Sequence, residues 1–465
     1  MNDCYRNPSV RQRLVEFLGG DGLEHATAVY ITHTDGCLFD RRELRPPQEL
    51  DWFLERNLDI DRSLADSTSL LLHLDVEYVN FDSPAEAYLD PWRAFDLQEP
   101  VVKAIETVLL GWGIEPLHII TGQGHHFVWK IARDTALANR ISALGPAPEL
   151  LDAGRMRMPA IVHERIDAAA QNAFAALSMI MEFVAHRVKK EAVPLCELPV
   201  EITAVHVGPG KTLRREIVSI DISEYGDPLH TRMVRLPFTY YLKPWLTGLA
   251  RSLGIEAEMP RVRVIPLHEM DVRVALKVRQ VEAEVEELAK RACVRIPDQT
   301  EGTERLLDDY LSSRLRRFHE FFYSAQHDPP ERWPMTYHRA PLEHLPPCAR
   351  RIADEPNDWL LKPAGMQLIT RCLLSEGWHP RHIAGFIRSR FENPAFGWGS
   401  RWDDYDAATR ADFYVRIFAG LYETGTDRLV DFNCVSTQEK GYCCAPSSGC
   451  SLAPCQTKLL TRQCK

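Results

Sequence analysis

The chain has 465 residues, of which 45% are hydrophobic and 26% are charged, and its formal net charge is −10. This composition is ordinary for a globular protein, and the length suits two or three domains. The negative charge argues against a surface coated for non-specific nucleic-acid binding, although it does not exclude a local basic groove. No apolar run approaches the roughly 18 residues that span a bilayer, and the N-terminal residues lack the apolar core of a signal peptide. We therefore expect a cytoplasmic protein without membrane contact.

In chain order, the sequence predicts helices and strands that alternate before a helical C-terminal third. A proline-rich stretch over residues 329–347 is typical of a domain boundary. The strands are expected over residues 28–32, 70–82, 117–120, 125–129, 200–207 and 216–222. The helices are expected over residues 8–19, 48–57, 100–110 (opened by Pro100), 161–188, 276–293, 303–323, 361–376, 380–391 and 407–422.

The apolar stretch that begins at Leu70 runs into two acids, Asp75 and Glu77. Side chains two residues apart on a strand project from the same face, so these carboxylates would stand side by side with Val76 buried behind them. Such a pair repels unless a proton or a cation lies between its members. A divalent ion that prefers oxygen ligands, such as Mg²⁺, is the usual reason to build it. The alternative is a strand end with two solvated acids.

A glycine-containing turn, Thr121-Gly122-Gln123-Gly124, follows a short expected strand and leads into His125 and His126. Two glycines let the backbone approach a ligand closely and turn its amides outward, which suits a phosphate. His126, on the strand that leaves the turn, would reach that phosphate as a donor. A histidine on a strand is otherwise most often structural.

A third motif is the apolar strand that ends in Asp221, followed downstream by Arg235 and Lys243. Three carboxylates from two strands would hold a pair of divalent ions, which activate an attacking hydroxyl and stabilise a leaving phosphate. The two cations would hold a triphosphate tail. Taken alone, Asp221 would be read as a surface residue.

The order of these motifs resembles the archaeo-eukaryotic primase superfamily, which includes the small catalytic primase subunit and the primase-polymerases. The similar pattern is Asp-x-Glu, then Thr-Gly-x-Gly-x-His, then an apolar strand ending in Asp, then Arg-x-Pro-Phe-Thr and Lys, over roughly residues 60 to 250. One departure is Tyr241, where some relatives place a histidine two residues before the lysine. The resemblance implies that Mg²⁺ or Mn²⁺ is bound by Asp75, Glu77 and Asp221, and that nucleotide is bound by Gly122, Gly124, His126, Arg235 and Lys243.

Six of the twelve cysteines lie in the last 32 residues, and such clustering suggests a metal or cluster site. Cys348 after Leu-Pro-Pro, Cys434 after Asp-Phe-Asn, and Cys450 sixteen residues later are similar to the iron–sulfur domain of the primase large subunit. Four thiolates hold such a cluster, here expected to be 4Fe–4S. Our ligand set is Cys348, Cys434, Cys444 and Cys450, with Cys443, Cys455 or Cys464 as other candidates for the fourth position. A zinc site built from the tail alone, by Cys434, Cys444, Cys450 and Cys455, is the alternative.

Together the patterns and the resemblance predict an α+β protein in three parts. Residues 1–255 would form a primase-type catalytic domain with an RRM-like sheet and helices, 256–335 a helical connector, and 336–465 a mainly α-helical, cysteine-bearing domain. The expected function is that of a DNA primase or primase-polymerase, which transfers nucleotides from NTP or dNTP to a 3′ hydroxyl by a two-metal mechanism. The expected partners are a single-stranded DNA template, nucleoside triphosphates, and other replication or defence proteins such as a helicase. The alternatives are a metal-dependent nuclease and a non-catalytic nucleic-acid-binding protein with a zinc/cysteine domain.

Overall fold

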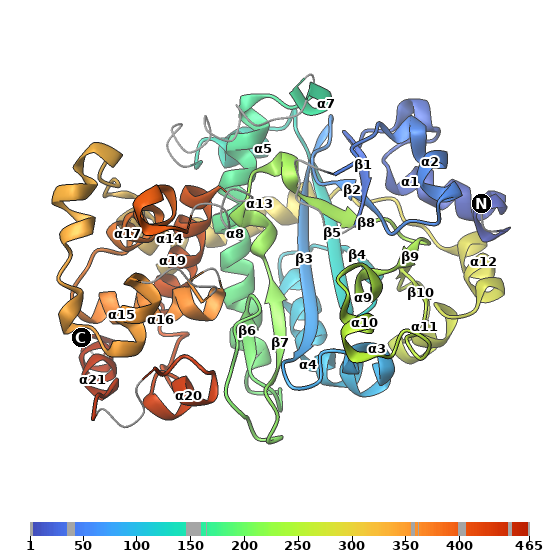
Figure 1. The fold of residues 1–465 in the computed structure, drawn as a ribbon. Coiled ribbons are helices and arrows are strands. Elements are labelled where there is room, and N and C mark those ends of the chain that lie inside the picture. Colours follow the sequence, from blue (N-terminus) through green and yellow to red (C-terminus); the bar gives the residue numbers. More distant parts are fainter. Residues whose placement is uncertain are drawn as a thin grey trace.

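The computed structural model describes residues 3–34, 42–145, 160–163, 165–354, 359–360, 362–398, 406–444 and 449–463. The fold is α+β: a central sheet stands between N-terminal elements on one side and the C-terminal helices on the other (Figure 1). The sheet carries the candidate site described below, and the helices bury its apolar faces.

The central sheet has six strands, and all neighbouring pairs are antiparallel except β6 with β7. The long strand β3 lies inside the sheet, so both of its edges are paired. Its residues Leu72, Leu74 and Val76 are fully buried, as expected for a strand that helices cover. In spatial order the strands are β11 (Ile265–Pro266), β4 (Leu117–Ile120), β5 (Gly124–Ala132), β3 (Ser69–Asn80), β7 (Glu216–Asp221) and β6 (Val200–Ile202).

Two smaller sheets flank this one. The first joins β1 (Ile31–His33), β2 (Ile60–Ser63) and β8 (Met233–Arg235), and the second pairs β9 (Tyr240–Tyr241) with β10 (Val262–Arg263). Residues 256–335, the expected connector, therefore contribute β10 and β11 as well as helices. Because β11 pairs with β4, this segment forms one edge of the central sheet.

Helices account for most of the remaining chain. Those of the N-terminal and central parts are α1 (Pro8–Phe17), α2 (Leu50–Glu55), α3 (Glu86–Leu89), α4 (Pro91–Gly111), α5 (Ala136–Ser142), α7 (Ala160–His163), α8 (Ala168–Ala192), α9 (Lys243–Leu246), α10 (Leu249–Leu253), α11 (Val272–Val278), α12 (Glu282–Arg291), α13 (Thr300–Ser312) and α14 (Arg314–Tyr323). Those of the C-terminal part are α15 (Pro347–Asp354), α16 (Pro363–Ser375), α17 (Pro380–Glu392), α19 (Ala407–Glu423), α20 (Cys434–Glu439) and α21 (Ala453–Gln463).

The helix expected to open at Pro100 begins at Pro91 instead, so that prediction was wrong. The carboxylate of Asp90 accepts a hydrogen bond from the Arg93 amide, and Pro91 occupies the first turn, where a missing N–H costs nothing. Pro100 lies inside α4. The expected helix over residues 303–323 is likewise two helices, because Ser313 caps the start of α14. The sequence also predicts a mainly helical stretch over residues 134–192 with a break at the Pro/Gly-rich residues 145–148, and this break falls mostly outside the described residues.

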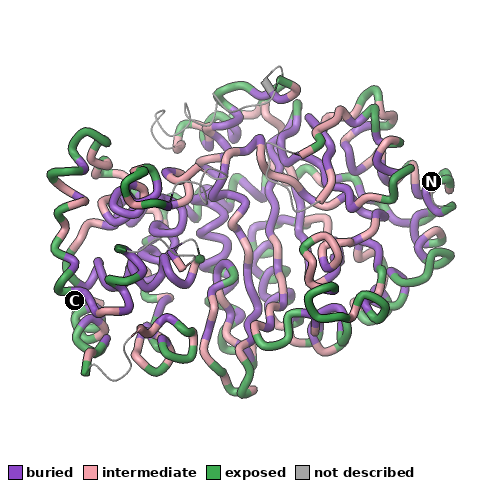
Figure 2. The backbone as a smooth tube through the Cα atoms, in the orientation of Figure 1, coloured by how far each residue is buried: buried purple, intermediate pink, exposed green. Residues whose placement is uncertain are grey.

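The sequence was expected to contain no apolar stretch long enough to span a bilayer, and helix α8 corrects that expectation. By length and composition it is apolar enough to cross a membrane, and it is the one such helix in the described part of the chain. Most of it is nevertheless buried inside the fold, which is typical of a core helix (Figure 2). It contacts β3 and β6 of the central sheet as well as α19 of the C-terminal part.

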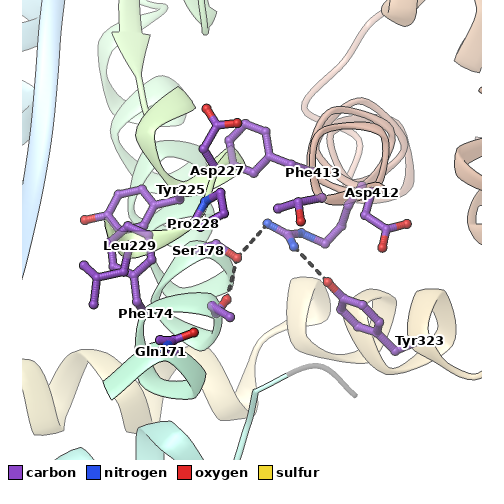
Figure 3. Close-up of a pocket in the computed structure, with 13 residues that line it drawn as sticks. Gln171, Phe174, Ser178, Tyr225, Asp227, Pro228, Leu229, Tyr323, Asp412 and Phe413 are labelled. Carbon is purple, nitrogen blue, oxygen red and sulfur yellow. Dashed lines mark hydrogen bonds between the residues drawn. The ribbon is translucent and has the colours of Figure 1, made fainter. Parts of the chain in front are cut away.

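A buried ionic network joins α8 to the C-terminal helices. Glu182 is fully buried, and its Oε2 accepts a hydrogen bond from Nε of Arg416 at 2.8 Å. The same guanidinium donates to Ser178 and to Tyr323, and Figure 3 shows these two side chains beside a small pocket between α8 and α19. His319 Nε2 lies 3.2 Å from Glu182 Oε2. This network connects α8, α14 and α19.

The charge balance of this network depends on Arg416. Burial alone would raise the pKa of Glu182, but His319 and Arg416 outweigh it and lower that pKa to about 2. Burial also lowers the pKa of His319, so the imidazole is neutral at neutral pH. We therefore assign Arg416 as the cation that compensates Glu182.

Replacing Arg416 by methionine should lower the free energy of unfolding by about 3–5 kcal/mol, because it leaves Glu182 as a buried and uncompensated charge. Urea denaturation at pH 7 measures the effect. Arg388→Met is the matched control, since Arg388 pairs with Glu392 on a partly exposed helix face, where such pairs contribute about 0–1 kcal/mol. Equal losses for the two variants would contradict the assignment.

Candidate active site

A row of polar side chains crosses three neighbouring strands of the central sheet. Asp75 on β3 lies directly opposite Asp221 on β7 and directly opposite His126 on β5. Residues that face each other across antiparallel strands project from the same side of the sheet. Glu77, two residues beyond Asp75, shares this face, while Val76 between them is fully buried on the other. The pairing thus gathers four of the expected site residues.

Burial and neighbouring negative charges raise the pKa of both aspartates of this row. Burial, followed by the charge of Glu77, holds the pKa of Asp75 well above its usual value. Burial, followed by the charges of Glu224, Asp75 and Glu77, raises the pKa of Asp221 to about 7. Asp75 Oδ1 is buried without a hydrogen bond, and His126 Nε2 lies 3.5 Å from it. The face therefore carries negative charge that it compensates poorly.

Lys243 stands beside the row, at the start of α9. Its Nζ lies 3.3 Å from Glu77 Oε1. Burial would raise the pKa of Glu77, but the charge and hydrogen bond of Lys243 outweigh burial and lower it. The Lys243 side chain as a whole is partly exposed.

Arg235, the weaker match to the primase pattern, is engaged within the protein. It forms an ion pair with Asp59, which is fully buried, and its guanidinium lies 4.3 Å from the centre of the Tyr241 ring. Burial would lower the pKa of Arg235, but Asp59 outweighs it and raises that pKa. The Arg235 guanidinium thus lies near the site, but its positive charge is already compensated by the carboxylate of Asp59.

Close packing explains why the turn has glycine at both positions, which the sequence alone did not predict. A Cβ on Gly124 would lie 1.8 Å from the carbonyl oxygen of Val76, and a Cβ on Gly122 would lie 2.3 Å from the ring of Tyr241. Because the first of these neighbours is backbone, it cannot move aside. The close approach of β5 to β3 therefore requires Gly124 whether or not a phosphate binds there.

Two residues of the site were missed from the sequence. His73 lies on the same face as Asp75, two residues earlier, and its Nδ1 is 3.0 Å from Glu224 Oε1. Its ring meets that of His126 edge to face, with centroids 4.6 Å apart, and its Nε2 is buried without a hydrogen bond. The alternation His73-x-Asp75-x-Glu77 was a usable signal for His73. Glu224, in the short 3-10 helix Ser223–Gly226 after β7, had none.

Within the described residues, no three His, Cys, Asp or Glu side chains are already arranged as the ligands of a metal ion. The chemistry of the row nevertheless fits a divalent cation. Asp75, Glu77 and Asp221 are oxygen donors of the kind that Mg²⁺ prefers, and Asp75 Oδ1 accepts no hydrogen bond. A bound cation would also relieve the repulsion that raises the pKa values of Asp75 and Asp221.

The C-terminal cysteines come together in part. Burial, and then the nearby thiolates of Cys443, Cys444 and Cys450, raise the pKa of Cys348 to about 12. Cys348, far earlier in the chain, thus lies within electrostatic range of the tail cysteines. Cys434 Sγ accepts a hydrogen bond from the Leu452 amide at 3.3 Å. The described thiols are not arranged as a set of metal ligands, although thiolates are the ligands that soft metals and iron–sulfur clusters use.

The structure distinguishes among the remaining candidates for the fourth cysteine ligand. A hydrogen bond with Cys372 lowers the pKa of Cys455, and the pKa of Cys372 is raised in turn by Cys455, by burial and by Cys348. Cys464 lies outside the described residues, as does the segment 445–448 between Cys444 and Cys450. Among the described cysteines, Cys443 and Cys444 are therefore the tail candidates that lie near Cys348.

Asp221 should make the metal-free protein less stable as the pH rises. Its pKa is about 7 in the folded state and about 3.9 when unfolded, so the folded state binds its proton more tightly and loses stability between these values. In EDTA at pH 8, Asp221→Asn should exceed the wild type in free energy of unfolding by about 2–4 kcal/mol, with a smaller gap at pH 5. Urea denaturation at both pH values measures this.

Asp82→Asn is the control of opposite sign. Hydrogen bonds from Arg215 lower the pKa of Asp82, so this carboxylate stabilises the fold when ionised, and its loss should not raise stability at pH 8. A wild-type stability that is flat from pH 5 to pH 8 and unaffected by Asp221→Asn would contradict the charge balance described here.

No protein-family model matches the chain, and neither a curated protein nor a solved structure resembles it significantly. Any function for the site therefore has to be inferred from its own residues and geometry.

Proposed function

We propose that the protein is a primase or primase-polymerase, which extends a 3′ hydroxyl on a single-stranded DNA template with NTP or dNTP. The observation that carries the proposal is the row of His126, Asp75 and Asp221 across three strands, with Glu77 on the same face. Mg²⁺ or Mn²⁺, held by the three carboxylates, would activate the attacking hydroxyl and stabilise the leaving pyrophosphate.

The protein's own side chains would bind and orient the triphosphate. Burial, and then the charges of His73 and Arg235, hold the pKa of His126 well below its usual value, so its imidazole is neutral at neutral pH. A neutral imidazole has one N–H to donate, and His126 Nδ1 has no hydrogen-bond partner. Lys243, partly exposed beside Glu77, would offer its ammonium to the same phosphates.

The position of Lys243 favours nucleotidyl transfer over the nuclease alternative. A nuclease needs the carboxylates and their cation to cleave a phosphodiester, but it has no triphosphate to hold. Here a cation with a partly exposed side chain lies 3.3 Å from one of the carboxylates, and the glycine turn that precedes His126 lies at the start of β5. Both features suit a nucleoside triphosphate.

We further propose that the C-terminal part holds a 4Fe–4S cluster, or zinc in the alternative. Cys348, Cys434, Cys444 and Cys450 would be the ligands, with Cys443 as the alternative to Cys444. The support is the proximity of Cys348 to Cys443, Cys444 and Cys450, which a site built only from the tail does not require. A cluster at this position would join α15 to the C-terminal segment and close a long loop.

Purified protein should extend a primer, or start one, on single-stranded DNA in the presence of Mn²⁺ or Mg²⁺ and labelled NTP or dNTP. Asp75→Asn and Asp221→Asn should each lower synthesis by more than about 100-fold, because each removes an ionised oxygen ligand. Asp82→Asn, at an exposed acid just beyond the end of β3, is the matched control and should retain activity. Wild-type synthesis by Asp75→Asn, or digestion of the template without any synthesis, would contradict the proposal.

His126→Ala should lower kcat/KM for the nucleotide by about 10- to 100-fold, since a charge-assisted hydrogen bond contributes roughly 1.5–3 kcal/mol. Template affinity, measured by fluorescence anisotropy, should change little. An insoluble variant, or one that loses both quantities equally, would instead indicate a structural role for this histidine.

Protein purified without oxygen should be brown and contain iron and sulfide in near-equal amounts. Cys348→Ser should remove the colour and destabilise the C-terminal part, because it deletes the ligand that comes from α15. Cys293→Ser, at an exposed cysteine, is the matched control. A colourless protein that binds zinc and is indifferent to Cys348→Ser would support the tail-only zinc site.

A further inference from the structure

The glycine turn at residues 121–124 has two backbone N–H groups that donate no hydrogen bond. The Thr121 amide donates to the carbonyl oxygen of Gly124, and the Gly124 amide donates to the hydroxyl of Thr121. Within the described parts of the chain, the amides of Gly122 and Gln123 have no acceptor, although Gly122 is buried. Buried amides without a partner are rare in proteins, and two successive ones suit a phosphate oxygen as an external acceptor.

Arg279, the residue that ends α11, holds the carbonyl groups of the same turn. Its Nη1 donates to the carbonyl oxygen of Thr121 and, at 3.4 Å, to that of Gly122. In a trans peptide unit the C=O and the following N–H point in opposite directions, and the described chain has no cis peptide bond. Arg279 therefore turns the amides of Gly122 and Gln123 away from itself.

Those amides point toward the face of the sheet that carries the carboxylate row. The guanidinium of Arg279 lies 5.1 Å from the centre of the Phe95 ring, and that ring lies 5.0 Å from the ring of His125. His125 and His126 are neighbours on β5, so they project from opposite faces. Since Arg279 lies on the His125 side, the two amides face the His126 side, where Asp75 is located.

Arg279 also carries a positive charge that the described residues do not compensate. Its side chain is 2% exposed, and it forms no ion pair with a carboxylate of those residues. Lys243 and Arg235, by contrast, each have a carboxylate partner. Burial lowers the pKa of Arg279 to about 10, so the guanidinium stays charged at neutral pH. An anion at the turn would supply the opposite charge, and the low dielectric of the interior strengthens that attraction.

We propose that Arg279 is a positioning residue, which makes the turn a binding loop for the terminal phosphates of a polyphosphate ligand. The N–H groups of Gly122 and Gln123 bind phosphate oxygens, while Arg279 fixes the peptide units from behind and supplies positive charge there. That the ligand is a nucleoside triphosphate rests on the proposed function. The affinity of the loop for polyphosphate does not, because inorganic triphosphate measures it without any synthesis.

Isothermal titration of the full-length protein with inorganic triphosphate in the presence of Mg²⁺ tests this role. Arg279→Met should weaken binding by at least about 10-fold, because the loop loses both its orientation and the charge behind it. Arg279→Lys keeps the charge but not the planar guanidinium, so its affinity should lie between those of Arg279→Met and the wild type, about 3-fold or more from each. Arg273→Met is the matched control, since Arg273 lies on the same helix, is exposed and pairs with Asp96.

Kinetics distinguish a positioning role from a merely structural one. In primer extension, Arg279→Met should raise KM for the nucleotide by at least about 10-fold and change kcat by less than about 3-fold. Template affinity, measured by fluorescence anisotropy, should stay unchanged, whereas a damaged fold would lower kcat and template affinity as well. Each variant's melting temperature is measured first. If Arg279→Met does not fold, the comparison of Arg279→Lys with the wild type decides.

Three results would overturn the inference: a wild type that does not bind inorganic triphosphate, a folded Arg279→Met that binds it as tightly as the wild type, and a loss that Arg273→Met shares. The outcome is separable from that of the proposed function. A wild type that makes no primer, yet loses triphosphate affinity on Arg279→Met, contradicts the proposed function and supports the loop. Synthesis by Arg279→Met with the KM of the wild type supports the proposed function and contradicts the loop.

Discussion

The pairing of β3 with a strand on each side is the constraint on which the candidate site depends. Side chains on a strand alternate with a period of two, so a slip of one residue would turn the acids into the core and expose the apolar residues between them. The complete burial of Leu72, Leu74 and Val76 opposes such a slip. Apolar packing on one face of β3 thus determines where the charges lie on the other face.

The ion pairs around the site then determine which of its carboxylates are left to carry the negative charge. Lys243 pairs with Glu77, and Arg235 pairs with Asp59, so each of these cations has its own carboxylate. Asp75 and Asp221 form no ion pair with a lysine or an arginine in the described parts of the chain. The uncompensated charge is therefore concentrated on two residues that face each other across β3 and β7. A divalent cation would therefore be stabilised most strongly between these two residues.

The sequence predicted those features that depend on local pattern. The alternation around Asp75 and Glu77 located β3 and its polar face, and the glycine turn located β4 and β5. It could not predict that Asp75 faces both His126 and Asp221, because the lateral order of strands depends on long-range packing. For the same reason Glu224, which reaches His73 from the turn after β7, had no sequence signal. The start of α4 was misplaced because Pro100 was taken as a first-turn proline while the cap at Asp90 was overlooked.

The buried network of Glu182 and Arg416 bears on how the chain folds during synthesis. The two residues are 234 positions apart, so α8 leaves the ribosome long before α19 exists. Until then the carboxylate of Glu182 has no guanidinium partner and favours hydration over burial. The nascent N-terminal half can form its local strand pairs, but burying an ionised Glu182 on α8 is unfavourable until α19 is available. We therefore expect the packing around Glu182 on α8 to be completed late, as the C-terminal helices emerge.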